Sequence, residues 1–300
     1  MTAFRWLLRI VTGLVVLAVL AMGLTYYILT RSLPDYNEDF TLQGITAPVE
    51  IVRNNANVPH IFGKTAEDVY FGLGFAHAQD RLWQMTMLRR TSQGRLSEIF
   101  GQRTVKIDEL IRRLDIYALS EQSVAAQDEP TRRALQAYSA GVNAWINQVN
   151  LGARGRGAPE FFFFSNEIAA WTPADSIAII KLMALQLSAH LEDEVLRAQI
   201  SMILPAPRLG DILPDDPGAG IAALPDYASL MPGPMPGPSP TKMAYIDAPL
   251  SPFHSRDFAG ASNAWAAMPD KAAAGGSLLA NDPHLGLTAP SIWYLARLEL

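Results

Sequence analysis

The architecture of this chain is deduced most directly from one segment, Gly72-Leu73-Gly74-Phe75-Ala76-His77-Ala78-Gln79-Asp80-Arg81-Leu82-Trp83-Gln84-Met85. Thr65 begins a helix that contains this segment, because Asp68 follows three residues later in a near capping-box arrangement. Apolar residues continue the helix at helical spacing: Phe71, Phe75, Leu82, Met85 and Leu88. Gly72 and Gly74 weaken its first half.

Regular elements are predicted on both sides of this helix. Before it, residues 49–61 alternate as strand, turn and strand, with Asn54-Asn55-Ala56-Asn57 as the turn. After it, helical patterns cover residues 106–125, 130–149 and 173–203. Three strands follow near the end of the chain, at 262–268, 277–280 and 293–300.

Composition excludes several classes of protein. Hydrophobic residues make up 49% and charged residues 18% of the 300 residues, which excludes a disordered chain. The net charge of -5 argues against nucleic acid as a partner. The chain has no cysteine, so disulfides, thiolate zinc sites, iron–sulfur clusters and cysteine nucleophiles are excluded.

The N-terminal segment predicts export. Residues 10–30 carry no charge and as a helix would span about 30 Å, one hydrocarbon thickness. Arg5 and Arg9 precede the segment, which places the amino terminus in the cytoplasm and the remainder in the periplasm or cell exterior. An uncleaved membrane anchor is the preferred interpretation. A cleaved signal peptide, with Val19-Leu20-Ala21 as a poor cleavage site, is the alternative.

A linker divides the chain. Residues 205–240 are dense in proline and glycine, a spacing that no packed helix or central strand tolerates. We therefore predict an anchor at 1–34, a helical and strand region at 35–204, a spacer at 205–261 and a further segment at 262–300. The last predicted strand has no turn or cap after it, so we expect a longer parent protein.

Familiar catalytic signatures are missing. The chain has no HExxH, GxSxG, GxGxxG or phosphate-loop motif. His77 with Asp80 would suit a ligand pair, but a hydrogen-bonded core histidine is favoured. A metal hydrolase that uses His60, His77 and His284 is a weaker alternative.

Ser262 has two interpretations. It follows the linker in Gly260-Ala261-Ser262-Asn263-Ala264-Trp265, where a strand simply begins. Alternatively, cleavage before Ser262 would place a hydroxyl and an α-amine on one residue. An α-amine has an ordinary pKa near 7.7–8.0, which suits a general base at neutral pH and requires no histidine partner.

Three blocks of sequence resemble a known family. They are residues 49–61, residues 66–98, and Ser262-Asn263-Ala264-Trp265 together with Asn281-Asp282-Pro283-His284-Leu285. The chain resembles the penicillin acylase (penicillin amidase) family of N-terminal nucleophile hydrolases. The resemblance implies an α+β fold, the αββα four-layer sandwich, incomplete in this chain, with Ser262 at the end of a central strand.

The resemblance also implies roles for individual residues. Ser262 matches the catalytic nucleophile, released by autocatalytic cleavage that yields an α/β heterodimer. His284 matches a flanking position that orients the α-amine, and Leu285 would face the acyl pocket. Asn263 and Trp265 are expected to be structural, holding the strand end and packing behind it. Asp80 and Arg81 are expected to form a buried ion pair on the helix.

The expected activity is hydrolysis of the amide bond in small N-acyl substrates, of the β-lactam side-chain or acyl-homoserine lactone type. Catalysis needs no cofactor. One structural calcium is expected, with Glu194 as a ligand, although Glu192 or Asp193 would serve as well. The 300 residues alone are expected to be inactive, since further catalytic groups of the family lie beyond them. The alternative is a non-catalytic, membrane-anchored scaffold.

Overall fold

The computed structural model describes residues 2–151, 157–164, 167–187, 197–203, 208, 262–283, 285 and 288–300. The chain divides into two compact units, residues 1–179 with 256–300, and residues 180–255. The larger unit carries the strands and the helical core. Most of the predicted spacer, 205–261, lies outside the described residues.

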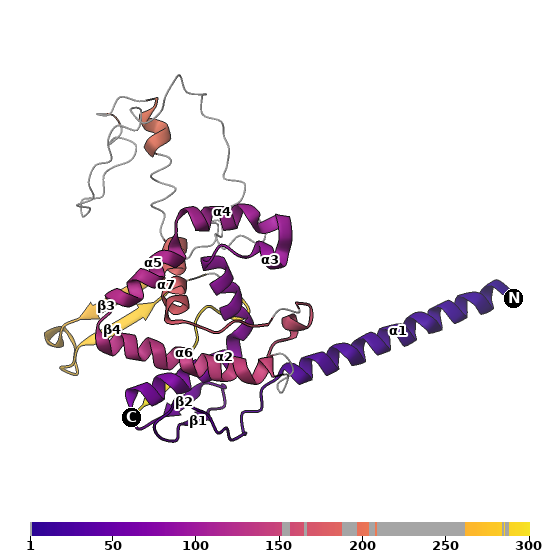
Figure 1. Cartoon of the computed structure of the whole chain (residues 1–300), viewed down its shortest axis with the longest axis horizontal. Helices are drawn as coiled ribbons and strands as arrows, with labels where there is room; N and C mark the ends of the chain where they lie inside the picture. The colour runs from indigo at the N-terminus through magenta and orange to yellow at the C-terminus, as the bar shows by residue number, and fades with distance from the viewer. Residues whose placement is uncertain are drawn as a thin grey trace. The chain divides into compact units, whose positions relative to one another are not determined.

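Helices and strands are mixed within this description (Figure 1). The helices are α1 (Thr2–Ser32), α2 (Ala66–Ser92), α3 (Ser97–Phe100), α4 (Val105–Arg113), α5 (Ile116–Ala126), α6 (Glu129–Asn150) and α7 (Pro173–Leu187). The strands are β1 (Glu50–Arg53), β2 (Pro59–Phe62), β3 (Asn263–Ala267), β4 (Leu278–Asp282) and β5 (Arg297–Glu299). Short 3-10 turns occupy Gly101–Thr104, Pro159–Phe162 and Pro269–Lys271.

The first helix is long and apolar enough to cross a membrane, with a mean hydropathy of 2.4 over its most apolar window. An N-terminal signal sequence would pass the same test of length and composition. An apolar N-terminal helix is thus present. Whether it remains as a membrane anchor or is removed as a signal peptide stays a prediction.

Two small sheets form among the described strands. β1 pairs antiparallel with β2, and β5 adds to β2 in parallel, so segments far apart in sequence share one sheet. Figure 1 shows the C-terminus beside β2. The predicted Asn-rich turn is confirmed, because Oδ1 of Asn54 accepts from the amides of Ala56 at 2.9 Å and Val58 at 3.0 Å. Asn57 takes the positive φ of 59° that asparagine tolerates.

The predicted start of the central helix is confirmed. The hydroxyl of Thr65 accepts from the amide of Asp68 at 3.1 Å, which satisfies one of the free donors at the start of α2. The helix continues to Ser92, but Arg81 interrupts it with non-helical angles, φ -134° and ψ 17°.

Helices α2 and α6 lie side by side and form the centre of the core (Figure 1). Their backbones approach closely at two glycines. A Cβ at Gly74 would collide with the carbonyl of Tyr138, and a Cβ at Gly141 with the carbonyl of Phe71. Around this contact the ring of Phe75 meets Trp145 edge to face at 5.6 Å. Gly74 therefore contributes to packing, beyond the helix-weakening effect that the sequence predicts.

Three predicted elements differ from the structure. The helix expected over 106–125 is two helices, because Asp115 adopts φ 52° and ends the first of them. The strand expected over 293–300 is regular only at Arg297–Glu299. The helix expected over 173–203 is described as α7, which reaches Leu187, and as a helical stretch at 197–201; the residues between lie outside the description.

Candidate functional site

Ser262 immediately precedes β3 and is exposed. β3 and β4 pair antiparallel, with Asn263 opposite Asp282 and Ala264 opposite Asn281. Continuing this register places Ser262 at the same end of the hairpin as Pro283. The two halves of the predicted signature, separated in sequence, thus meet at one end of the β3–β4 hairpin.

The other predicted site residues are described unevenly. Leu285 is half-buried and Asn263 is exposed. Trp265 is 60% exposed, so the packing expected behind β3 stays a prediction. His284 and Glu194 lie outside the described residues. Among the residues that are described, no group of three or more histidine or acidic side chains is placed to hold a metal ion.

Asp80 is the centre of a polar cluster that the sequence did not reveal. Its Oδ2 lies 2.7 Å from Nη1 of Arg53 and accepts from the hydroxyl of Tyr294 at 2.7 Å. Its Oδ1 accepts from the hydroxyl of Tyr36 at 2.8 Å. The Arg53 and Asp80 side chains are only 8% and 12% exposed. The predicted ion pair between Asp80 and Arg81 is therefore wrong: Arg53 is the partner, and Arg81 donates to the carbonyl of Ser291 at 3.0 Å.

His77 adjoins this cluster as a core histidine, as predicted. Its Nδ1 lies 2.7 Å from the hydroxyl of Tyr138, and its ring stacks on Tyr294 with centroids 4.4 Å apart. Burial lowers the pKa of His77 to about 4, with a further lowering by the charge of Arg81 that Asp80 opposes. Burial also raises the pKa of Tyr138. The pair is therefore neutral at pH 7.

The low pKa of His77 predicts acid sensitivity. An unfolded histidine has a pKa near 6.5, so between pH 6.5 and about 4 the unfolded chain binds the extra proton and stability falls as the pH falls. This histidine should account for about 3 kcal/mol of the free energy of unfolding lost over that window. Urea denaturation at pH 7 and pH 4 measures the loss.

His77→Gln provides the comparison, because glutamine keeps hydrogen-bonding capacity but does not titrate. We expect the variant to lose less free energy of unfolding between pH 7 and pH 4 than the unsubstituted protein. Identical pH dependence in both proteins would contradict the assignment.

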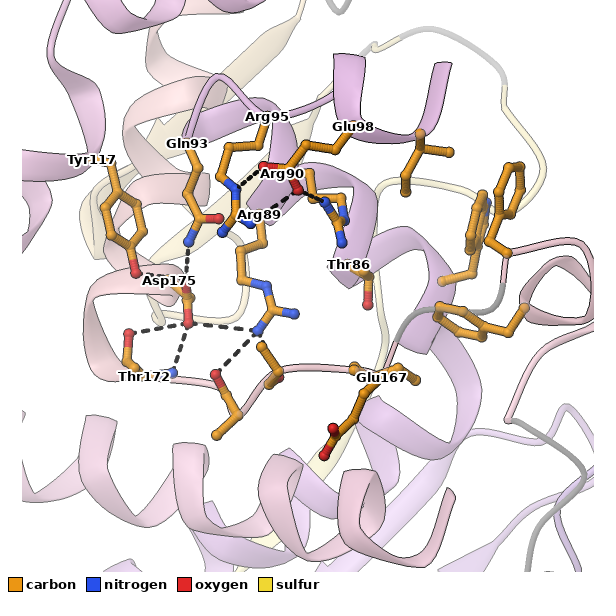
Figure 2. Close-up of a pocket in the computed structure, with 17 residues that line it drawn as sticks. Thr86, Arg89, Arg90, Gln93, Arg95, Glu98, Tyr117, Glu167, Thr172 and Asp175 are labelled. Carbon is orange, nitrogen blue, oxygen red and sulfur yellow. Dashed lines mark hydrogen bonds and ion pairs between the residues drawn. The ribbon is translucent and has the colours of Figure 1, made fainter. Parts of the chain in front are cut away.

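A cavity of about 310 Å³ lies beside the C-terminal half of α2 (Figure 2). Trp83, Phe161 and Phe164 form an aromatic part of its wall, in which Trp83 stacks on Phe164 at 5.3 Å. Arg89, Arg90, Arg95, Glu98, Gln93, Tyr117 and Asp175 are among the polar residues that line it.

Most of the charged side chains around this cavity pair with one another. Glu98 accepts from Arg90 and Arg95, each at 2.6 Å, and the hydrogen bond from Arg95 lowers the pKa of Glu98. Arg89 donates to the carbonyl of Ala169 at 2.9 Å and faces Asp175 at 4.0 Å (Figure 2). The described lining includes no serine, histidine or lysine. The lining does include two threonines, Thr86 and Thr172. Arg89 joins α2 to the segment before α7 through the carbonyls of Ala169 and Ala170.

A profile of the penicillin amidase family matches residues 48–300. The chain belongs to this family.

The relatives within the family are named either as penicillin acylases or as acyl-homoserine lactone acylases. Penicillin acylase 2 proenzyme of Pseudomonas sp. (strain SE83) is 30% identical over 279 residues, 88% of this chain and 34% of that protein. Acyl-homoserine lactone acylase QuiP of Pseudomonas aeruginosa is 29% identical over 270 residues, 87% of this chain and 30% of that protein. The chain thus spans about a third of the length of these relatives. Among solved structures, a thermostable penicillin G acylase from Alcaligenes faecalis is 26% identical with a TM-score of 0.47, over 64% of this chain and 98% of that one.

Proposed function

We propose that the parent protein is an exported amidohydrolase that cleaves N-acyl amides with Ser262 as an N-terminal nucleophile. The Ser262 hydroxyl attacks the substrate carbonyl while its α-amine accepts the hydroxyl proton. That proton passes to the leaving amine, an acyl-serine ester forms, and water hydrolyses the ester to the free acid. His284 would orient the α-amine, and its backbone N–H would stabilise the oxyanion.

The nucleophile requires a preceding cleavage. The Ser262 hydroxyl attacks the carbonyl of Ala261, which converts the peptide bond into an ester. Hydrolysis of that ester leaves the Ala261 carboxylate and the free α-amine of Ser262. The products would be an α chain from 35–204, a spacer 205–261 and a β chain that begins at Ser262, in an αββα sandwich.

The family match across 48–300, which includes Ser262-Asn263-Ala264-Trp265, is the observation that carries this proposal. The hairpin register supports it, since it brings Ser262 to the end of β4 from which the chain continues to His284 and Leu285. The apolar helix α1 supports export, as an anchor or a signal. We further propose Glu194 as one carboxylate ligand of a structural calcium, in keeping with the three consecutive acidic residues at 192–194.

Mass spectrometry of the protein expressed from its own gene tests the proposal. A mature chain whose first residue is Ser262 is expected. Turnover should then be measured on penicillin G, an aliphatic N-acyl-homoserine lactone and a glutaryl amide. Three acyl groups are needed because the relatives include both penicillin acylases and acyl-homoserine lactone acylases, which does not identify the acyl group that this protein accepts. Intact protein without turnover of any of these would instead support a membrane-anchored scaffold.

A further inference from the structure

We infer that residues 291–299 and the Asp80 cluster form the clamp that keeps the two cleavage products together. This inference rests on the proposed cleavage before Ser262. Residues 291–299 lie after that point and would belong to the second product. Tyr36, Arg53, His77, Asp80 and Arg81 lie before it and would belong to the first. The structure joins these two sets of residues by backbone and by side-chain contacts within one compact unit.

The backbone part of the clamp is a strand shared between the products. β5 pairs in parallel with β2, with His60 opposite Arg297 and Ile61 opposite Leu298. The amide of Gly63 donates to the carbonyl of Glu299 at 3.1 Å and extends the pairing beyond β2. Ile61 itself is fully buried. After cleavage, the second product would supply the third strand of a sheet whose first two strands belong to the first product.

The side-chain part is centred on Tyr294. Its hydroxyl donates to Oδ2 of Asp80 at 2.7 Å, and its ring stacks on His77 with an interplanar angle of 19°. Burial raises the pKa of Tyr294, so the hydroxyl keeps its proton and remains a donor. A hydrogen bond to a buried carboxylate is stronger than one between neutral groups.

A second contact lies one turn along α2. Nη1 of Arg81 and Nε2 of Gln84 donate to the carbonyl of Ser291, at 3.0 Å and 3.3 Å. These bonds fix the backbone of the second segment three residues before Tyr294. The tyrosine hydroxyl, the aromatic ring and the backbone carbonyl of the second product are thus held by α2 residues on both sides of its interruption at Arg81.

Tyr36 makes the clamp testable, because it provides a matched contact to the same carboxylate. Its hydroxyl donates to Oδ1 of Asp80 at 2.8 Å. Tyr36 and Asp80 both precede Ser262, so this bond lies within the first product. Tyr36→Phe and Tyr294→Phe each remove one hydroxyl from Asp80, but only the second removes a contact between products.

The experiment compares these two variants in the parent protein after cleavage. If the protein does not cleave itself, an inserted protease site between Gly233 and Gly237 provides the cut, so the clamp is tested independently of the proposed catalysis. With an affinity tag on the first product, the retained amount of the second is followed across a urea series and over dilution.

Tyr294→Phe is expected to raise the dissociation constant of the two products by about 10-fold or more, and Tyr36→Phe to leave it within about 2-fold. In uncut protein the same bond lies within one chain, so the unfolding midpoint of Tyr294→Phe should not depend on protein concentration. The inference would be overturned if the products of the Tyr294→Phe protein dissociated no more readily than those of the unsubstituted protein. It would also be overturned if Tyr36→Phe raised the dissociation constant as much as Tyr294→Phe does.

Discussion

Ser262→Ala is expected to leave the peptide bond after Ala261 intact and to abolish amide hydrolysis. Alanine has no hydroxyl, so neither the acyl shift that starts cleavage nor the attack on a substrate carbonyl is possible. Loss of a catalytic nucleophile reduces kcat by about 10⁴-fold or more. Intact-mass measurement reports the cleavage, and release of a chromophore from an N-acyl amide reports turnover, both in protein expressed from the complete gene.

Ser277→Ala is the matched control for this substitution. Ser277 immediately precedes β4, at the opposite end of the hairpin from Ser262. Because its hydroxyl has no part in the proposed chemistry, cleavage and turnover of this variant should equal those of the unsubstituted protein. Ser262→Cys keeps a nucleophile at the site and should retain cleavage. Normal turnover by uncut Ser262→Ala protein would refute the mechanism.

Gly141→Ala is expected to have the largest effect on stability. Alanine favours a helix over glycine by about 1 kcal/mol, so helix propensity alone predicts stabilisation. Packing predicts the opposite, because the new Cβ would collide with the carbonyl of Phe71 on α2. A backbone carbonyl cannot rotate away as a side chain can, so α2 and α6 must separate. We expect a net loss of about 3 kcal/mol or more in the free energy of unfolding.

Thermal and urea denaturation measure this loss, and Gln136→Ala provides the control. Gln136 lies on the exposed side of the same helix. Its replacement should change stability by no more than about 0.5 kcal/mol. A stabilised Gly141→Ala protein would show that the helices are not in backbone contact at this position.

Local signals in the sequence predicted local structure well. The Thr65 cap and the Asn54 turn were both predictable because each depends on a side chain that bonds the backbone within four residues. The break between α4 and α5 was not predictable, because it contains neither glycine nor proline. Asp115 takes the left-handed conformation there, which aspartate tolerates without requiring it.

Contacts distant in sequence were predicted poorly. Asp80 and Arg81 are consecutive residues of a helix, and consecutive side chains point in different directions, which explains why they do not pair. The actual partner, Arg53, is on a strand that precedes α2. No sequence pattern identified Tyr294, because its contact depends on how the last segment folds back. The preference for Ser262 as the nucleophile followed only from the family resemblance, since one serine before a strand has no distinctive spacing.

The interruption of α2 at Arg81 separates two sets of interactions along a single helix. Asp80 and its tyrosines lie at the break, whereas Arg89 and Arg90 lie after it, beside the cavity. A continuous helix would couple the orientation of these side chains, because rotating one end would rotate the other. Because the regular geometry is broken between them, a change in the cavity wall need not be transmitted to the residues around Asp80.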